Sequence, residues 1–217
     1  MMNYNNKIKV IGFDLDQTLY PKSPKIDEAI QIYIYQKIDQ HKKCGLKKAE
    51  ELFKGLYQEG RGLSGSKTLI KLGIPNAKDV VQEALENADI ASFLKPNQKT
   101  INLLQKLKDR YHNLDLITGS NINIVLDKLA KLEIPKDIFL HIIANASKSD
   151  GQAYKIWLSY YKKFKAEEFI YIGDRVSDHL VPKTIGIQTI LINITKKDNT
   201  IDCPQLSSIE KLESFLL

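Results

Sequence analysis

Residues 10–20 read VIGFDLDQTLY, an apolar run that ends at two acidic residues. The stretch from Lys7 to Phe13 is short and rich in β-branched residues, which predicts a buried parallel strand. Asp14 and Asp16 follow at its carboxyl end, where open α/β sheets bind their ligands. Two carboxylates there repel each other unless a positive group joins them, and a hard divalent cation is the simplest candidate. By itself the stretch is equally consistent with a solvated Asp-rich turn.

The composition of the 217 residues is that of an ordinary globular chain, with 43% hydrophobic and 27% charged residues. This length suits one large domain or one domain that carries an insertion. No apolar run approaches the roughly 20 residues of a transmembrane helix, and residues 1–6 show no secretory pattern. We therefore expect a cytoplasmic protein without a membrane partner.

Basic residues outnumber the acids, and the formal net charge is +6. The lysines occur in short pairs spread along the chain, which is typical of solvated helix faces rather than of a nucleic-acid surface. A positive field also favours the approach of a small anionic substrate. The two cysteines, Cys44 and Cys203, have no metal-binding or redox spacing, so we expect free thiols.

A block of helical patterns follows the first strand. Ser23 and Pro24 supply a helix start, and apolar residues recur at helical spacing as far as Ile38. Further amphipathic patterns cover residues 49–57, 67–72 and 80–88, with glycines between them. Because no strand pattern occurs from Pro21 to Lys95, we expect residues 21–95 to form a helical cap inserted after the first acidic pair.

From Pro96 the pattern changes to helices that alternate with short apolar strands. Such alternation predicts parallel βαβ units, and hence an α/β fold with a Rossmann-like parallel sheet. The predicted domains are a core of residues 1–20 and 96–217 and a cap of residues 21–95. The later core strands are expected at 114–117, 139–143, 169–172 and 189–192, and the helices at 101–107, 121–132, 152–163, 180–185 and 208–216.

Polar residues follow three of these later strands. Thr118, Gly119 and Ser120 offer a hydroxyl and backbone N–H groups that suit a phosphate oxygen. Lys148 supplies a compact positive charge after the next strand, and Asp174 adds a third carboxylate after the one that follows. Since parallel strands end at one edge of the sheet, we expect these groups to converge on the first acidic pair.

With these segments in place, the sequence resembles the haloacid dehalogenase superfamily in its phosphatase branch. Residues 14–19, DLDQTL, match the first motif of that superfamily, Thr118 with Gly119 the second, Lys148 the third, and residues 173–178, GDRVSD, the fourth. The resemblance covers nearly the whole chain, with a helical cap between the first and second motifs. It implies the Rossmann-like core of the superfamily and a cap of the C1 type.

The resemblance also implies a division of chemical roles. Asp14 is the expected nucleophile, which forms an aspartyl-phosphate, and Asp16 is the expected general acid and base. Mg²⁺ is the implied cofactor, held by Asp14, the backbone carbonyl of Asp16 and Asp174, with Asp178 as a supporting partner of the metal site. The residues expected to bind the substrate are Leu15, Thr118, Gly119, Ser120 and Lys148.

Some of these assignments have competitors. The third-motif lysine is predicted as Lys148, and Lys155 is the alternative because the prolines common in this loop are absent. Asp178 is also a reasonable helix N-cap. Tyr20 and Arg61 are candidates for substrate contacts, since residues 16–21 and the glycine-rich residues 60–65 resemble the pyrimidine 5′-nucleotidase group.

The predicted function is a Mg²⁺-dependent phosphomonoesterase that acts on a small phosphorylated metabolite, with a nucleoside monophosphate as one candidate. Asp16 favours phosphate esters over the carbon–halogen bonds cleaved by superfamily members without this carboxylate. A phosphomutase would carry the same motifs, and a non-catalytic phosphate-binding module on this fold is the alternative of a different class. A dinucleotide-binding enzyme is disfavoured because no Gly-x-Gly-x-x-Gly follows the first strand.

Overall fold

The computed structural model describes residues 7–21, 23–59, 65–88, 90–194 and 196–217. The chain divides into two compact units, each with its own buried core. The first unit joins Met1–Lys22 to Leu94–Leu217, and the second comprises Ser23–Phe93. None of the described helices combines the length and the apolar character that a membrane span requires.

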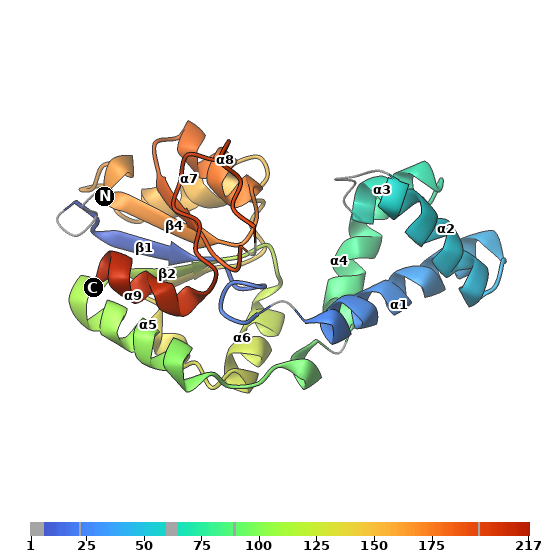
Figure 1. Ribbon diagram of the computed structural model, residues 1–217, viewed down its shortest axis with the longest axis horizontal. Helices are drawn as coiled ribbons and strands as arrows, with labels where there is room; N and C mark the ends of the chain where they lie inside the picture. Colours follow the sequence, from blue (N-terminus) through green and yellow to red (C-terminus); the bar gives the residue numbers. More distant parts are fainter. Residues whose placement is uncertain (1–6, 22, 60–64, 89, 195) are drawn as a thin grey trace. The chain divides into compact units, whose positions relative to one another are not determined.

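A five-stranded parallel sheet forms the centre of the first unit (Figure 1). Neighbouring strands are parallel throughout, and the central strands are buried along their whole length, as expected for a sheet covered on both faces. The prediction of an α/β fold with a Rossmann-like sheet is confirmed. The order is β3-β2-β1-β4-β5, with strands β1 (Val10–Phe13), β2 (Leu114–Ile117), β3 (His141–Ile143), β4 (Phe169–Gly173) and β5 (Gln188–Leu191).

Helices cover both faces of this sheet. α5 (Gln98–Tyr111) and α9 (Glu213–Leu216) lie on one side of it, and α7 (Gln152–Ser159) and α8 (Ser177–Thr184) lie on the other (Figure 1). The Tyr111 hydroxyl donates to the carbonyl of Leu216 over 2.8 Å, which ties the end of the chain to α5. The remaining helices of the unit are α6 (Ile122–Lys131), η3 (Lys136–Ile138), η4 (Ala166–Glu168) and η5 (Ile209–Leu212).

The strand order reverses between β1 and β4. Within the sheet, β2 and β3 follow one another outward from one edge of β1. β4 and β5 follow outward from its opposite edge. Connections that leave in opposite directions open a crevice beyond the carboxyl ends of the two strands. Asp14 follows β1 and Asp174 follows β4, so the fold brings both carboxylates to this edge.

The described residues of the second unit form helices joined by turns. α1 begins as predicted, with Ser23 at the N-cap and Pro24 in the first turn. Ile38, Phe53 and Leu69 are among the residues of its own core, so the unit is stabilised by its internal packing. Its elements are α1 (Pro24–Lys42), α2 (Leu46–Glu59), α3 (Gly65–Lys71), α4 (Ala77–Asn87) and η2 (Ala91–Phe93).

Several predicted elements of the first unit differ in length from the observed ones. β3 starts at His141 rather than Phe139, because Phe139 closes η3 with its N–H donated to a carbonyl of that turn. α7 ends at Ser159 rather than at 163, because the N–H groups that follow it bond three residues back, as in a tight turn. α8 begins at Ser177 rather than near 180, and the predicted helix at 208–216 divides into η5 and α9.

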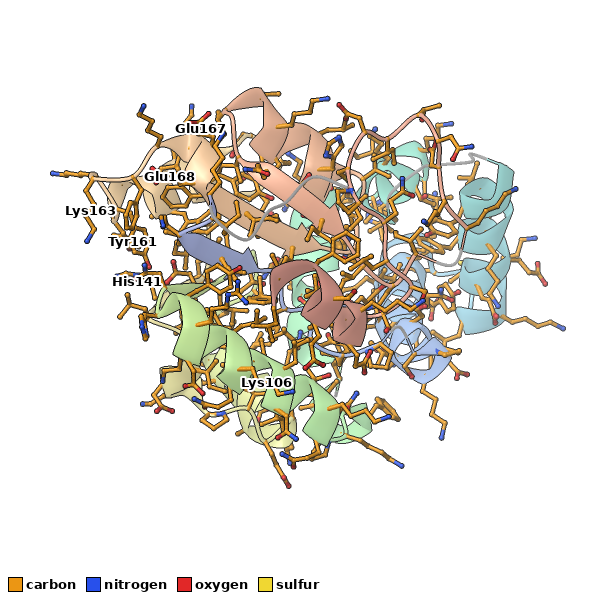
Figure 2. All side chains as sticks on the ribbon, turned by 60° about the vertical axis from the view of Figure 1, so that its left-hand side comes forward. Lys106, His141, Tyr161, Lys163, Glu167 and Glu168 are labelled. Carbon is orange, nitrogen blue, oxygen red and sulfur yellow. The ribbon has the colours of Figure 1, made fainter. Side chains whose placement is uncertain are left out.

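A buried carboxylate near the start of β2 fixes α7 and the turn after it on the sheet. Asp115 accepts hydrogen bonds from Trp157 Nε1 and the Tyr161 hydroxyl, both over 2.7 Å. Nδ1 of His141 lies 3.0 Å from the same carboxylate. Figure 2 shows His141 and Tyr161 next to each other, with ring centroids 5.3 Å apart. Because a buried charge needs such partners, this network is a structural anchor of the fold.

Gly12 allows α7 to approach β1 closely. A Cβ atom at this position would lie 2.7 Å from the indole of Trp157 and from Cδ1 of Ile117. The indole is fully buried and makes edge contacts with the rings of Phe169 and Tyr171. A glycine inside the first strand is therefore required by the packing of Trp157.

We expect Gly12→Ala to lower the free energy of unfolding of the first unit by about 1–3 kcal/mol, because the added methyl group overpacks this contact. Trp157 is the single tryptophan of the chain, so urea unfolding followed by its fluorescence reports on this unit. Gly55→Ala is the control, since its Cβ would meet nothing within 4 Å and it belongs to the second unit. Equal stability of Gly12→Ala and the wild type would contradict the packing argument.

Candidate active site

Asp14 lies directly after β1, at the centre of the candidate site. Its N–H donates to the carbonyl of Ile172 in β4 over 2.8 Å, which fixes the loop between the two central strands. The side chain is buried, and its Oδ1 lies 2.8 Å from Nζ of Lys148. The predicted nucleophile and the predicted third-motif lysine therefore form an ion pair.

The loop after β3 brings Lys148, and not Lys155, to this position. Nζ of Lys148 lies 3.3 Å from Asp178 Oδ1 as well, so the lysine bridges two carboxylates. Lys155 lies exposed on α7. The loop turns at Gly151, whose φ of 81° favours glycine. Gly151 is the N-cap of α7 and its N–H donates to the carbonyl of Lys148 over 3.2 Å, so the turn joins the loop that carries the lysine to this helix.

Asp178 points back into the site. It lies in the first turn of α8, and its Oδ2 accepts a hydrogen bond from the N–H of Arg175 over 3.1 Å. A Cβ on Gly173 would lie 2.6 Å from the Asp178 side chain, so the glycine of the fourth motif leaves the space that this carboxylate occupies. The N-cap of α8 is Val176, and the alternative of Asp178 as the N-cap is wrong.

Three carboxylates gather where the resemblance implies a metal ion. Oxygens of Asp14, Asp174 and Asp178 all lie within 4.8 Å of one another. Oδ1 of Asp174 is buried without a hydrogen-bond partner among the described residues, with Arg175 Nε 4.0 Å away. Clustered carboxylate oxygens are the donors that a hard divalent cation takes, and an unpartnered buried oxygen leaves room for one more interaction. The residues present therefore fit Mg²⁺.

The Asp16 carboxylate faces a different set of donors. Its Oδ1 accepts hydrogen bonds from Nζ of Lys128 over 2.6 Å and from the Tyr20 hydroxyl over 2.5 Å. Its Oδ2 accepts one from Ser120 Oγ over 3.1 Å. The two acids of the first motif, although only two residues apart, therefore have separate lysine partners.

Lys128 is a site residue that sequence reasoning missed. The scattered lysines predict solvated side chains, yet Lys128 is buried. The available signal is its spacing, because Lys128 shares an i, i+3, i+4, i+7 stripe of buried residues with Val125, Leu129 and Leu132. A lysine inside an apolar helix face needs an acidic partner, and that requirement points to the site.

Hydrogen bonds within the segment after β2 hold it in place. The N–H of Thr118 donates to the carbonyl of Ile143 in β3 over 2.9 Å. The Thr118 hydroxyl accepts a hydrogen bond from the N–H of Ser120 over 3.2 Å, across Gly119. The Ser120 hydroxyl donates its hydrogen bond to the Asp16 carboxylate. Phosphate binding by residues 118–120 stays a prediction.

The remaining predicted contacts have different outcomes. Leu15 is fully buried, and its carbonyl accepts the N–H groups of Thr18 and Leu19, which closes the turn that carries the two acids. Its part in substrate binding stays a prediction. The hydroxyl of Tyr20 bonds to Asp16 rather than standing free for a substrate. Arg61 lies outside the described residues.

Burial and charge shift the pKa values of the site acids in opposite directions. Burial raises the pKa of Asp14 to about 7 and that of Asp174 to about 6. Burial also acts to raise the pKa of Asp16, but the ammonium of Lys128 and the neighbouring hydroxyls outweigh it, so that the pKa of Asp16 is lowered. Without a cation, Asp14 is partly protonated near neutral pH while Asp16 is ionised.

The sequence pattern of the haloacid dehalogenase-like hydrolases matches residues 11–192. The chain belongs to this family. The resemblance inferred from the four motifs is thereby confirmed. A relative of this hydrolase, the glyceraldehyde 3-phosphate phosphatase of Methanocaldococcus jannaschii, is 28% identical over 194 aligned positions, and the match covers 85% of each chain.

Solved structures of other family members share the fold. A HAD phosphatase from Thermococcus onnurineus aligns with a TM-score of 0.66 and 20% identity, over 95% of this chain and 97% of its own. A haloacid dehalogenase-like hydrolase from Streptococcus pneumoniae aligns with a TM-score of 0.66 and 19% identity, over 96% and 97%. Similarity at this level of identity shows a common fold.

We expect Lys148→Met to destabilise this hydrolase in the presence of EDTA, because Asp14 and Asp178 then lose their shared cation. Removing one partner of a buried ion pair costs about 3–5 kcal/mol, and the 20% exposure of the Lys148 side chain reduces the expected loss to about 1–3 kcal/mol. Lys155→Met removes an exposed lysine and should change stability by less than about 0.5 kcal/mol. Urea unfolding followed by Trp157 fluorescence measures both variants.

The loss of stability caused by Lys148→Met should also depend on pH. Burial raises the pKa of Asp14 from an ordinary 3.8 to about 7, so between these values the folded protein holds a proton that the unfolded chain releases. Protonation of Asp14 removes the charge that Lys148 compensates. The cost of Lys148→Met should therefore be larger at pH 8 than at pH 5. A cost that is the same at both pH values, or that Lys155→Met reproduces, would argue against the pairing.

Proposed function

We propose that the protein is a Mg²⁺-dependent phosphomonoesterase that hydrolyses a small phosphorylated metabolite through an aspartyl-phosphate. The observation that carries the proposal is the separation of the two first-motif acids: Asp14 faces Lys148 and the acidic cluster, whereas Asp16 faces Lys128. Phosphoryl transfer through a covalent intermediate needs one carboxylate that attacks and another that moves a proton. The family match and the phosphatase relative support the same reaction.

In the first displacement a carboxylate oxygen of Asp14 bonds to phosphorus, and the bond from phosphorus to the ester oxygen breaks. Because the Asp16 carboxylate is ionised in the free site, it must take up a proton before this step. Asp16 then delivers that proton to the departing oxygen, a role worth typically ~10²–10⁴-fold in rate. Lys148 and the Thr118 hydroxyl would hold the phosphoryl oxygens while negative charge develops on them. The alcohol leaves, and the phosphoryl group stays on Asp14.

In the second displacement a water molecule attacks the phosphorus of the aspartyl-phosphate. Asp16 gave up its proton in the first step, so it now accepts a proton from this water. The bond between phosphorus and the Asp14 oxygen breaks. This step regenerates the Asp14 carboxylate and releases inorganic phosphate.

The residues proposed to hold Mg²⁺ are Asp14, Asp174 and the backbone carbonyl of Asp16, with Asp178 as a supporting partner of the metal site. When bound, the cation compensates the charge between an anionic nucleophile and an anionic phosphoryl group. The buried Asp174 oxygen, which has no hydrogen-bond partner among the described residues, supports the assignment. The raised pKa of Asp14 also supports it, because a carboxylate that must be ionised to attack needs more positive charge than Lys148 alone supplies.

The proposed substrate is an ester of an alcohol, because such a leaving group needs the proton that Asp16 would supply. The relative that is 28% identical is named for glyceraldehyde 3-phosphate, and this name supports a short phosphorylated sugar or aldehyde. A nucleoside monophosphate is the second candidate, since residues 16–21 and 60–65 resemble the nucleotidase group. Both candidates are small phosphorylated metabolites.

Release of inorganic phosphate from a panel of esters tests the proposal. The panel contains p-nitrophenyl phosphate, glyceraldehyde 3-phosphate, hexose phosphates and nucleoside monophosphates. We expect turnover that EDTA abolishes and Mg²⁺ restores, and Asp14→Asn should lower kcat by about 10⁴-fold or more because no nucleophile remains.

Three outcomes would contradict this function. Turnover that survives EDTA or the Asp14→Asn substitution would exclude the mechanism. Conversion of a hexose 1-phosphate into its isomer with little free phosphate would identify a phosphomutase. Binding of Mg²⁺ and phosphate without turnover of any ester in the panel would identify a binding module.

A further inference from the structure

Lys128 is a buried charge that the roles above do not use. Its side chain is 2% exposed, and its Nζ lies 2.6 Å from Asp16 Oδ1. Burial of an ammonium group to this degree is costly, and hydrophobic residues in place of a buried ion pair are often neutral or stabilising. An apolar residue would continue the buried stripe of α6, so the packing of the helix gives no reason for a lysine, and Lys128 is explained only together with the Asp16 carboxylate that it compensates.

We propose that Lys128 is a positioning residue that holds the Asp16 carboxylate in the orientation required for proton transfer to the leaving oxygen. This inference rests on the function proposed above. It adds to that function a residue of α6 that lies outside the four motifs.

Three separate segments hold the Asp16 carboxylate. Tyr20 comes from the loop that carries Asp16, Ser120 from the segment after β2, and Lys128 from α6. Two donors bind Oδ1 and one binds Oδ2, so both oxygens are fixed. Of the three donors only Lys128 carries a charge, and its contact is therefore expected to contribute most to the orientation.

Lys128 also separates Asp16 from the acidic cluster. Oxygens of Asp14, Asp174 and Asp178 converge within 4.8 Å, and the Asp16 side chain is absent from that group of described residues. A carboxylate so close in sequence to Asp14 would otherwise be attracted to the cation that these acids are proposed to hold. The pair with Lys128 keeps it available for the substrate.

The helix that carries Lys128 lies next in the chain to the segment proposed to bind the phosphoryl group. α6 follows directly on residues 118–120, which carry the hydroxyl proposed to contact the phosphoryl group. The segment that carries this hydroxyl therefore leads into the helix that, through Lys128, holds the Asp16 carboxylate. Loss of Lys128 should disturb proton delivery and leave phosphoryl binding largely intact.

The leaving group of the substrate provides the test. The value of kcat/KM reports the steps up to formation of the phosphorylated protein. The p-nitrophenolate ion departs without a proton, whereas the alcohol of glyceraldehyde 3-phosphate needs one. We expect Lys128→Met to lower kcat/KM for glyceraldehyde 3-phosphate, or for the hexose phosphate that the wild type hydrolyses fastest, by about 10²-fold, and that for p-nitrophenyl phosphate by less than about threefold.

Two further variants complete the experiment. Lys131→Met removes an exposed lysine of the same helix and should leave both values unchanged. Lys128→Gln keeps an N–H donor without the charge, should retain part of the activity on the alkyl ester, and replaces Lys128→Met if that variant does not fold.

The opposite results overturn the proposal. Equal losses on both esters in a folded variant, or failure of both Lys128 variants to fold, would show a structural role. A higher KM on both esters with unchanged kcat would show direct substrate binding. Failure of the proposed function is distinguishable, because the wild type would then hydrolyse neither ester in a Mg²⁺-dependent way.

Discussion

Repulsion among four carboxylates at one edge of a parallel sheet is the constraint around which the site is arranged. Buried like charges at this spacing cannot all ionise unless positive charge is brought among them. Lys148 bridges two of the acids and Lys128 pairs with a third. The fourth has Arg175 Nε 4.0 Å away and keeps a buried oxygen that accepts no hydrogen bond among the described residues, which is where a further cation is needed. The four acids are Asp14, Asp16, Asp174 and Asp178.

The sheet order explains how acids and lysines meet. The acids come from segments that follow β1 and β4, which are neighbours at the centre of the sheet. The lysines come from α6, after β2, and from the loop after β3. In the order β3-β2-β1-β4 the segments that carry the lysines lie beside those that carry the acids. The site therefore exists only when the whole first unit is folded, and the packing of Trp157 on Gly12 supports it from one face.

Much of the fold could be predicted from the sequence because its signals are local. The apolar run before Asp14, the helical spacing after Ser23 and the strand at 114–117 depend on neighbours within a few residues, and all of them are found in the structure. The convergence of Asp14, Lys148 and Asp174 also follows from one rule, that parallel strands end at the same edge.

The partners of Asp16 could not be predicted in this way. Its contacts with Ser120 and Lys128 join residues 104 and 112 positions apart. The helical spacing of Lys128 indicates that it lies on a buried face, but no local pattern identifies Asp16 as its partner. The predicted start of β3 and the predicted end of α7 are also wrong. At both points the sequence pattern continues past the last residue that makes the regular hydrogen bonds of the element. Asp178 is a comparable case, since its side chain turns back toward Lys148 only when Gly173 leaves room for it.

Capture of the phosphorylated protein tests the central claim, that Asp14 attacks and Asp16 moves the proton, most directly. Asp16→Asn would be mixed with Mg²⁺ and ³²P-labelled p-nitrophenyl phosphate, quenched in acid within milliseconds and digested for mass spectrometry. The aryl ester needs no proton to leave, whereas the second step lacks its base, so label should accumulate on the peptide that contains Asp14 and be released by hydroxylamine. Label on any other residue, or phosphate release without labelled protein at any quench time, would contradict the account.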